Sequence, residues 1–306
     1  MYRLHTNDPL AENAMKLLRD SGIFEITTGH YNKEELKENL EGIEFLVVRS
    51  ATKVTADVLS AGNDLKVVGR AGVGLDNVDV ETAKKLGIQV YNTPGANAIS
   101  VAELTMGLLL SLVRHIPKGT YSLKENLWEK KKLKGNEIYG KTLGLIGFGA
   151  IGKEMAKRSL AFGMKVFVYD PFVESTDMDV KLYDEIESML PEVDVLSLHV
   201  PLNNQTKHMI SKKELNIIKD GALIVNASRG GVLDEQALYD AIISEKVRAA
   251  ALDVFEVEPP NDELRRKLLG LDNVIATPHI GASTVEGQVR VGVEMAKKLI
   301  EVGKKL

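Results

Sequence analysis

The sequence of 306 residues contains no cysteine, which excludes disulfide bridges, thiolate metal sites and a cysteine nucleophile. Aromatic residues make up only 5% of the chain, so we expect a core built mainly from aliphatic side chains. The formal net charge of −4 gives no general attraction to nucleic acid or to a membrane surface. A chain of this length exceeds one hydrophobic core of ordinary size, which favours two domains.

Long apolar runs are missing as well. The most apolar stretch extends only from Leu104 to Val113, whereas a membrane-spanning helix needs about 20 such residues. We therefore interpret this stretch as a buried helix. The first residues also lack the apolar run of a signal peptide, and we expect a soluble, cytoplasmic protein.

Short β-branched runs alternate with amphipathic segments of helical length, which predicts βαβ units and parallel sheets. The first part of the chain has strands predicted at 45–49, 65–69 and 88–91, and helices at 11–20, 33–40 and 80–86. Six further strands are predicted at 142–146, 165–169, 193–197, 222–226, 249–252 and 273–276, before a final helix at 285–302. Six strands is the number in a complete dinucleotide-binding sheet. The sequence therefore predicts a duplicated α/β architecture.

A connecting region joins the two series of strands. It begins with a turn at Pro94 and Gly95 and continues as a helix predicted from about residue 100 to 116. Ser100 and Glu103 have the spacing of a capping box at the start of this helix. The stretch that follows, 118–134, is polar and basic, with three consecutive lysines at 130–132.

A glycine-rich turn follows the first strand of the second series. Gly147, Gly149 and Gly152 have the spacing of the dinucleotide-binding fingerprint, between a strand and a helix that extends to about Phe162. In this motif the first glycine permits a tight turn and the second lets the backbone approach a pyrophosphate. The third lets the helix and the strand pack closely. The start of the helix offers unpaired N–H groups and a positive dipole to the phosphates.

Asp170 ends the next strand, 18 residues after Gly152. A carboxylate in this position accepts hydrogen bonds from the adenosine ribose hydroxyls and repels a 2′-phosphate. Pro171 and Phe172 supply no replacement cation, so the sequence favours NAD over NADP. The alternatives are an ordinary capping aspartate after a glycine-rich turn, and a flavin site, although flavin motifs usually stand at the N-terminus.

Three reactive side chains each follow one of the last three predicted strands, at the end where α/β sheets bind ligands. They are Arg229, Glu258 and His279. Taken singly, Arg229 could form a surface ion pair, Glu258 could cap a turn before Pro259, and His279 could be structural. Their shared placement beside a dinucleotide-binding fold favours a common site.

Hydride transfer between a 2-hydroxy acid and NAD needs a base for the hydroxyl proton, a group that orients this base, and a cation for the carboxylate. Histidine suits the first role because its ordinary pKa lies near neutrality, which points to His279. A carboxylate on the other ring nitrogen, here Glu258, would fix the tautomer and stabilise the imidazolium. Arg229 would bind the carboxylate with two hydrogen bonds and polarise the adjacent carbonyl. We predict that these three residues are catalytic.

The remaining histidines have no acidic or histidine neighbours at the spacing of metal ligands, so no metal site is predicted. His199 ends a predicted strand. It could line a cofactor cleft or have a structural role.

Seven segments in order make the chain similar to the D-isomer-specific 2-hydroxyacid dehydrogenases over essentially its whole length. They are 48–53, 68–77, 92–94, 147–152, 226–234, 252–260 and 277–284. Within this family the chain most closely resembles the members that oxidise 3-phosphoglycerate. The resemblance implies two Rossmann-like parallel-sheet domains, with an NAD domain at 96–283 inserted into a flavodoxin-like substrate domain at 1–95 plus 284–306.

The resemblance also implies the residues of the site. The catalytic roles fall on the three residues already named. Cofactor contacts are implied at Val73, Gly147, Gly149, Ala150, Ile151, Gly152, Asp170, Val200, Ala227, Arg229, Asp253, His279, Gly281 and Ala282. Substrate contacts are implied at Arg49, Ser50, Lys53, Arg70, Gly74 and Asn97. Three of the cofactor positions often carry polar side chains in the family, so here only backbone contacts are open to Val73, Ala150 and Val200.

The function implied is the NAD-dependent oxidation of 3-phospho-D-glycerate to 3-phosphohydroxypyruvate. Arg49 and Arg229 would supply the two cations that a substrate with a carboxylate and a phosphate requires. The alternatives are a glyoxylate or hydroxypyruvate reductase and an NAD(H)-sensing, corepressor-like binding protein. The family also implies a homodimer or higher homo-oligomer that contacts through the basic region near Trp128, for which a solvated loop is the alternative. No regulatory module is expected after the final helix.

Overall fold

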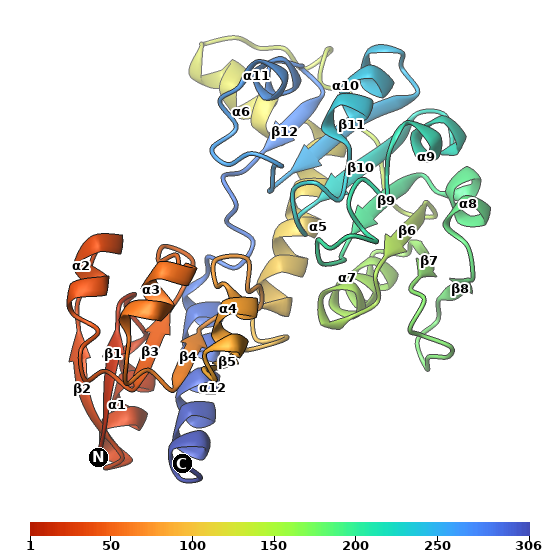
Figure 1. Ribbon diagram of the computed structural model, residues 1–306. Coiled ribbons are helices and arrows are strands. Elements are labelled where there is room, and N and C mark those ends of the chain that lie inside the picture. The colour runs from red at the N-terminus through yellow and green to blue at the C-terminus, as the bar shows by residue number, and fades with distance from the viewer. The chain divides into compact units, whose positions relative to one another are not determined.

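The computed structural model describes residues 1–306, which divide into two compact units. The first unit comprises Met1–Asn97 and Ala282–Leu306, and the second comprises Ala98–Gly281. In Figure 1 the first unit is drawn in red and orange together with the dark blue end of the chain. The sequence placed the boundaries at 95 and 283. That the first unit binds the substrate stays a prediction.

The first unit contains a five-stranded parallel sheet with the strand order β2-β1-β3-β4-β5. This order is the flavodoxin-like one. The strands are β1 (Tyr2–Thr6), β2 (Phe24–Thr28), β3 (Phe45–Val48), β4 (Val67–Arg70) and β5 (Gln89–Tyr91). The helices are α1 (Glu12–Asp20), α2 (Lys33–Glu38), α3 (Ala56–Ala61), α4 (Val80–Lys85) and α12 (Val285–Gly303).

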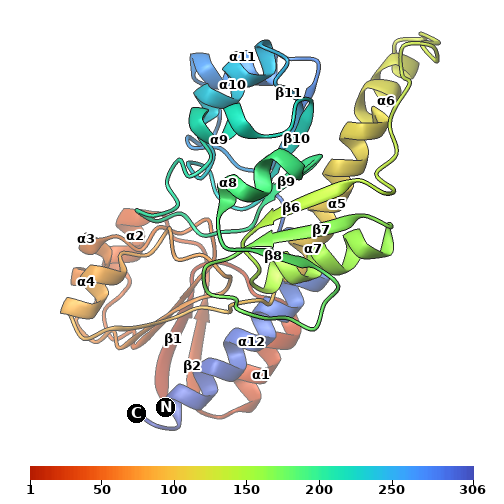
Figure 2. The ribbon, with the colours of Figure 1, turned by 90° about the vertical axis from the view of Figure 1, so that its right-hand side faces the viewer.

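Alternate residues of β3 serve the two faces of this sheet, as the period of two in a strand requires. Phe45 and Val47 pack with side chains of α1 and α12, whereas Leu46 and Val48 pack with those of α2, α3 and α4. Figure 2 shows α1 and α12 side by side along one face. All four β3 residues are buried, so the strand is hydrophobic throughout.

The second unit contains a seven-stranded parallel sheet with the order β12-β11-β10-β9-β6-β7-β8. All six predicted strands are present, and the prediction of two parallel-sheet α/β domains is confirmed. The strands are β6 (Thr142–Ile146), β7 (Lys165–Tyr169), β8 (Lys181–Tyr183), β9 (Val195–Leu198), β10 (Ala222–Asn226), β11 (Val247–Leu252) and β12 (Val274–Ala276). The additional strand, β8, was not predicted.

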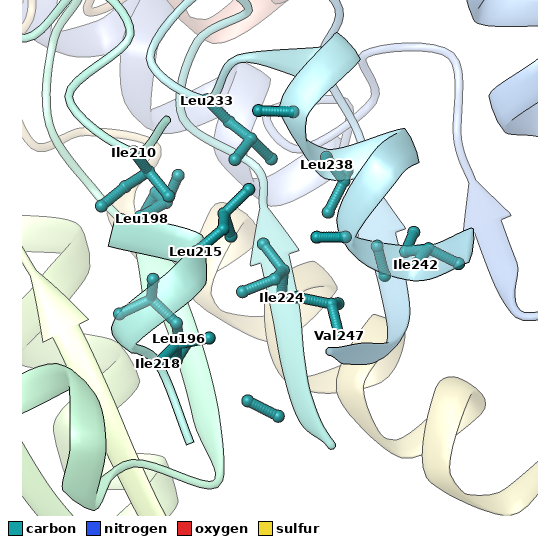
Figure 3. Packing of buried hydrophobic residues seen from close by; sticks show 14 of the residues in the cluster. Leu196, Leu198, Ile210, Leu215, Ile218, Ile224, Leu233, Leu238, Ile242 and Val247 are labelled. Atoms are coloured by element: carbon teal, nitrogen blue, oxygen red, sulfur yellow. The ribbon is translucent and has the colours of Figure 1, made fainter. Parts of the chain in front are cut away.

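Helices cover both faces of this second sheet. They are α5 (Ala98–Arg114), α6 (Ile116–Lys124), α7 (Ala150–Ala161), α8 (Ile186–Met189), the short 3-10 helix η1 (Leu190–Glu192), α9 (Lys212–Ile217), α10 (Glu235–Ile243) and α11 (Glu263–Leu269). On one face, Leu196, Leu198 and Ile224 of the strands meet Leu215 of α9 and Leu238 of α10 (Figure 3). The other face packs against α5 and α7.

One prediction about the connecting region is wrong, that of a capping box at Ser100. The helix α5 begins at Ala98, so Ser100 lies inside its first turn and does not cap it. Glu103 instead forms an ion pair with Arg158 of α7, with Oε1 and Nη2 2.9 Å apart. The basic stretch after α5 is also partly helical, because α6 covers 116–124.

The apolar stretch at Leu104 lies within α5, where ten residues are buried against the sheet and its neighbours. No single helix is both long enough and apolar enough to cross a membrane. The pair α5 and α6 meets those two criteria only together, with a bend of 63° between them.

Candidate active site

The glycine-rich turn connects β6 to α7, and each glycine has a distinct surrounding. Gly147 has φ +94°, and a Cβ atom there would lie 2.5 Å from the backbone oxygen of His199. A Cβ atom at Gly152 would lie 2.2 Å from the oxygen of Gly147. Gly149, by contrast, has no atom within 4 Å of the position of a Cβ. The outer two glycines are therefore required by backbone packing, and the middle one borders open space that fits a pyrophosphate.

Asp170 follows β7, the strand that pairs with β6, and lies beside the glycine turn. Its carboxylate accepts hydrogen bonds from the amide of Phe148 at 2.7 Å and from that of Phe172 at 2.9 Å. Each carboxylate oxygen can accept a second hydrogen bond. Asp170 thus stabilises the turn and retains acceptor capacity for ribose hydroxyls.

His199 lies where the strand order of the second sheet reverses, between β9 and β6. Its amide donates to the oxygen of Ile146 at 2.7 Å, and its Nε2 lies 2.9 Å from Ser197 Oγ. The Nδ1 atom is enclosed and has no hydrogen-bond partner. Burial lowers the pKa of His199 to about 4, so the ring is neutral at pH 7. These contacts favour the structural alternative, in which His199 supports the glycine turn.

Glu258 and His279 form a hydrogen-bonded pair on the loops after β11 and β12. Glu258 Oε2 lies 2.8 Å from His279 Nδ1, and Glu258 Oε1 accepts a hydrogen bond of 3.0 Å from the amide of Phe255. The two side chains are 37% and 48% exposed, so the other ring nitrogen of His279 can be reached by a ligand. This is the geometry of a base whose tautomer is fixed by a carboxylate.

Asp253 supports the loop that carries His279. Asp253 is 1% exposed, and its Oδ1 accepts from Thr277 Oγ1 at 2.5 Å and from the Ile280 amide at 2.8 Å. Its Oδ2 accepts from the Gly281 amide at 2.8 Å, and its backbone oxygen accepts from the His279 amide, also at 2.8 Å. The sequence did not reveal this role, because the four partners are distant in the chain. A direct contact between Asp253 and the cofactor stays a prediction.

Arg229 lies on the loop after β10 and is held by its neighbours. Asn226 Nδ2 donates to the Arg229 oxygen at 3.0 Å, and Arg229 Nη1 donates to the Ser228 oxygen at 2.7 Å. A Cβ atom at Gly230 would lie 1.9 Å from the oxygen of Phe255, so this loop packs directly on the loop that carries Glu258. The structure therefore places the three predicted catalytic residues on neighbouring loops at one edge of the second unit.

The other predicted site residues divide between the two units. In the second unit lie the glycine motif with Ala150 and Ile151, and also Asp170, Val200, Ala227, Asp253 and Gly281. In the first unit lie Val73 and Ala282, and all the predicted substrate contacts, Arg49, Ser50, Lys53, Arg70, Gly74 and Asn97.

Two of these substrate residues lie at the carboxyl ends of neighbouring strands in the first unit. Arg70 ends β4 opposite Val48 of β3, and Arg49 follows Val48 directly. Asn77 joins them, because its Nδ2 donates to the Arg49 oxygen at 2.6 Å and its Oδ1 accepts from Arg70 Nε at 3.2 Å. The Arg49 amide donates to Asp8 Oδ2 at 2.6 Å. Neither Asp8 nor Asn77 was predicted as a site residue.

The second unit combines a glycine turn that fits a dinucleotide with an exposed histidine oriented by a carboxylate. This arrangement defines a nicotinamide-dependent oxidoreductase. The family model for the D-isomer specific 2-hydroxyacid dehydrogenase, NAD binding domain, matches residues 106–281. The chain belongs to this family, and it is an NAD-dependent D-2-hydroxyacid dehydrogenase. The predicted class and the predicted cofactor are thereby confirmed.

Similar proteins carry the names of more than one enzyme. A hydroxypyruvate reductase from Thermotoga maritima is 57% identical over 300 residues, which are 98% of this chain and 98% of the relative. A D-3-phosphoglycerate dehydrogenase from Methanocaldococcus jannaschii is 50% identical over 305 residues, 99% of this chain. The chain spans only 57% of the length of this second relative. The sequence suggested a member of the family that oxidises 3-phosphoglycerate. Sequence identity to these relatives does not distinguish that activity from the reduction of hydroxypyruvate.

Solved structures agree on the fold. A D-lactate dehydrogenase from Aquifex aeolicus, complexed with NAD and lactic acid, superposes with a TM-score of 0.85 at 32% identity, covering 99% of this chain and 96% of that one. An NAD-bound 3-phosphoglycerate dehydrogenase from Entamoeba histolytica gives a TM-score of 0.80 at 30% identity, covering 98% and 94%.

Proposed function

We propose that the enzyme oxidises 3-phospho-D-glycerate to 3-phosphohydroxypyruvate with NAD. The observation that carries the proposal is the grouping of cations in the first unit. Arg49 and Arg70 stand at the carboxyl ends of adjacent strands and share Asn77, and Lys53 is exposed on the loop that follows Arg49. A substrate with only a carboxylate would be served by Arg229. The additional cations suit a phosphate.

The proposed chemistry rests on the second unit. His279 takes the proton of the substrate hydroxyl. Glu258 stabilises the imidazolium that forms, because its Oε2 is within hydrogen-bond distance of His279 Nδ1, at 2.8 Å. Arg229 binds the substrate carboxylate and draws electrons from the forming carbonyl. Gly147, Gly149 and Gly152 would cradle the pyrophosphate of NAD, and Asp170 would hold its adenosine ribose. Bound NAD supplies the acceptor for the hydride.

Hydroxypyruvate is the second candidate substrate, and the relative that is 57% identical over nearly the whole chain supports it. The two substrates differ by one phosphate. We therefore propose to compare kcat/KM for 3-phosphohydroxypyruvate, hydroxypyruvate and glyoxylate, each with NADH and with NADPH. We expect the phosphorylated substrate to be preferred by about 100-fold, which is the value of one or two charged hydrogen bonds. A preference for hydroxypyruvate would replace the first candidate with the second.

Lys53 allows the role of the phosphate to be tested in one variant. Lys53→Met should lower kcat/KM for the phosphorylated substrate by roughly tenfold and leave that for hydroxypyruvate unchanged, since one charge-assisted contact is lost. Lys85→Met, which removes an exposed lysine of the same unit, is the control. An equal loss for both substrates would show that Lys53 does not bind the phosphate.

Asp170 is proposed to set the preference for NAD. Asp170→Ala should weaken NADH binding by about tenfold and improve binding of NADPH, because a ribose acceptor and a source of repulsion are both removed. Fluorescence titration with each cofactor measures the two changes. If the ratio of the two affinities stayed the same, another group would have to recognise the ribose.

We further propose that the enzyme is a homodimer that uses α6 and the loop after it. Large apolar side chains are exposed there, including Tyr121, Leu123, Leu127 and Trp128, the last of which is 82% exposed. Several exposed large apolar side chains within one short segment are typical of a protein interface. Sedimentation of the wild type and of Trp128→Glu measures the association, and a wild-type monomer would disprove the proposal.

A further inference from the structure

The loop between β11 and α11, residues 253–262, carries Glu258 and is held by charged side chains from outside the site. We call it the Glu258 loop. We propose that Arg265 of α11, together with Glu235 of α10, is a positioning residue that holds Glu258 in place against His279. The inference rests on the proposed catalytic roles of Glu258 and His279.

Arg265 connects both ends of the Glu258 loop to α10. Its Nη2 lies 3.3 Å from Glu256 Oε2 near the start of the loop, and its Nη1 lies 3.1 Å from Asp262 Oδ2 at the end. Its Nε lies 2.7 Å from Glu235 Oε2. Glu258 stands between the two loop residues that Arg265 holds. A single guanidinium thus fixes the span of the loop.

Glu235 binds the backbone of the loop as well as Arg265. Its Oε1 accepts a hydrogen bond of 2.7 Å from the amide of Glu256. Glu235 is 3% exposed and Arg265 is 7% exposed, so the pair lies in the protein interior. Burial raises the pKa of Glu235, and the Glu256 amide and Arg265 oppose this rise. The Glu256 amide and Arg265 therefore both favour the charged form of this buried carboxyl group.

The amide that binds Glu258 directly precedes the amide that Glu235 holds. The amide of Phe255 donates to Glu258 Oε1 at 3.0 Å, and the next amide, that of Glu256, is the one that Glu235 holds. The two amides belong to the peptide units on either side of the Phe255 Cα atom, so holding the Glu256 amide restricts where the Phe255 donor can lie. Glu256 Oε1 also lies 3.2 Å from His208 Nε2, which joins the loop after β9 to the same cluster.

A purely stabilising role explains this cluster poorly. Buried ion pairs usually stabilise a fold less than apolar side chains of the same size would. The helix α11 also has other supports, because Leu268 is fully buried and the Asp262 side chain caps the first turn. What the guanidinium adds is a fixed geometry among three carboxylates. Two of these contacts, those with Glu256 and Asp262, are directional hydrogen bonds, and such bonds suit the positioning of a catalytic loop.

A double-mutant cycle tests whether Arg265 acts through Glu258. We expect Arg265→Met to lower kcat about tenfold, less than the roughly 100-fold that a 1 Å misplacement can cause. The KM for NADH should change less than twofold, because the glycine turn is not involved. In the Glu258→Gln background, Arg265→Met should have no further effect on kcat. Additive losses, or an unchanged kcat in the single variant, would overturn the proposal.

A readout that needs neither cofactor nor turnover is the state of the His279 ring. In protein with ¹⁵N-labelled histidine, the wild-type ring should show one tautomer with the proton on Nδ1, assigned with His279→Asn. Arg265→Met should convert it to a mixture of tautomers, and a spectrum like that of the wild type would contradict the positioning role. If Glu258→Gln left kcat intact, the proposed function of Glu258 would fail, and this spectrum would still decide whether Arg265 fixes the pair.

Matched variants separate positioning from stability. Arg265→Lys should recover only part of kcat, because an ammonium cannot bind three carboxylates in the guanidinium geometry. Glu235→Gln should act in the same direction as Arg265→Met and needs no change of size. Arg158→Met removes a partly buried arginine that lies far from the Glu258 loop in the sequence and binds two carboxylates of its own. It should lower the melting temperature without altering kcat or the His279 ring. An Arg158→Met loss of kcat equal to that of Arg265→Met would indicate general destabilisation and overturn the inference.

Discussion

Both sheets are parallel, but they differ at the edge formed by the carboxyl ends of their strands. In the first unit, Asn7, Asp8 and Thr52 follow β1 and β3 and are 1%, 3% and 5% exposed. In the second unit, Glu258 and His279 follow β11 and β12 and have side chains that are 37% and 48% exposed. In the first unit the part of the edge formed by Asn7, Asp8 and Thr52 is closed, whereas the edge of the second unit after β11 and β12 is open to ligands.

At the closed edge the polar side chains use their hydrogen-bonding groups on one another. Asn7 Oδ1 accepts from the Tyr31 amide at 2.9 Å, and Asn7 Nδ2 donates to Thr52 Oγ1 at 2.8 Å. Thr52 Oγ1 in turn donates to Asp8 Oδ1 at 3.0 Å. At the open edge, space remains beside Gly149 and one ring nitrogen of His279 has no protein partner. Polar residues after parallel strands therefore indicate a site only where they retain hydrogen-bonding capacity.

The largest expected effect tests the open edge. His279→Ala should lower kcat about 100- to 10,000-fold, the usual contribution of a general acid–base group. NADH binding, measured by fluorescence, should change less than threefold, since the glycine turn is intact. His30→Ala, which removes an exposed histidine near the closed edge, is the control. Turnover retained by His279→Ala would remove this residue from the mechanism and weaken the contrast between the edges.

The second and third glycines of the cofactor turn, Gly149 and Gly152, give the next largest effect. Gly152→Ala should destabilise the fold by about 3 kcal/mol, because its methyl group would meet the Gly147 oxygen at 2.2 Å. Gly149→Ala should leave the melting temperature unchanged and weaken NADH binding about tenfold or more, since its methyl group would enter the open space. Thermal unfolding and NADH titration measure the two. Similar melting temperatures for both variants would contradict this assignment.

The sequence predicted the open edge better than the closed one, for physical reasons. The strand β10 (Ala222–Asn226) is buried throughout and is recognisable from the unbroken apolar run of its first four residues. The strands β1 and β2 mix polar and apolar residues, and β8 has only three residues, so none gives a clear periodic signal. Without β1, the position of Asp8 at a strand end could not be predicted.

The site could be predicted in part. Glu258 and His279 follow strands that are adjacent in both sequence and sheet, so their pairing could be inferred from the order of the elements. The supports of the pair could not. Asp253 binds a loop more than twenty residues away, and Arg265 binds carboxylates on two elements, so both roles depend on the packing of helices on the sheet.

Acid should affect the second unit through His199. The pKa of His199 is lowered by burial to about 4, against an ordinary value of 6.5, so the unfolded chain binds a proton that the folded chain excludes. Stability is therefore full above pH 6.5 and is lost as the pH falls from 6.5 to 4, by about 3 kcal/mol. His199→Phe should remove this part of the pH dependence in urea unfolding. A variant as acid-sensitive as the wild type would place the protonation elsewhere.

The smallest expected effect tests the closed edge. Asp8→Ala should lower the free energy of unfolding by about 2 kcal/mol, because the amides of Arg49 and Thr52 and the Thr52 hydroxyl lose their acceptor. NADH binding should be unaffected, since the glycine turn and Asp170 belong to the second unit. The KM for the substrate should rise, because Asp8 fixes the backbone of Arg49. Asp57→Ala, at an exposed aspartate of the same unit, should change stability by less than about 0.5 kcal/mol. If Asp8→Ala weakened NADH binding while stability and KM stayed unchanged, Asn7, Asp8 and Thr52 would not form a closed structural cluster, and the distinction between the two edges would fail.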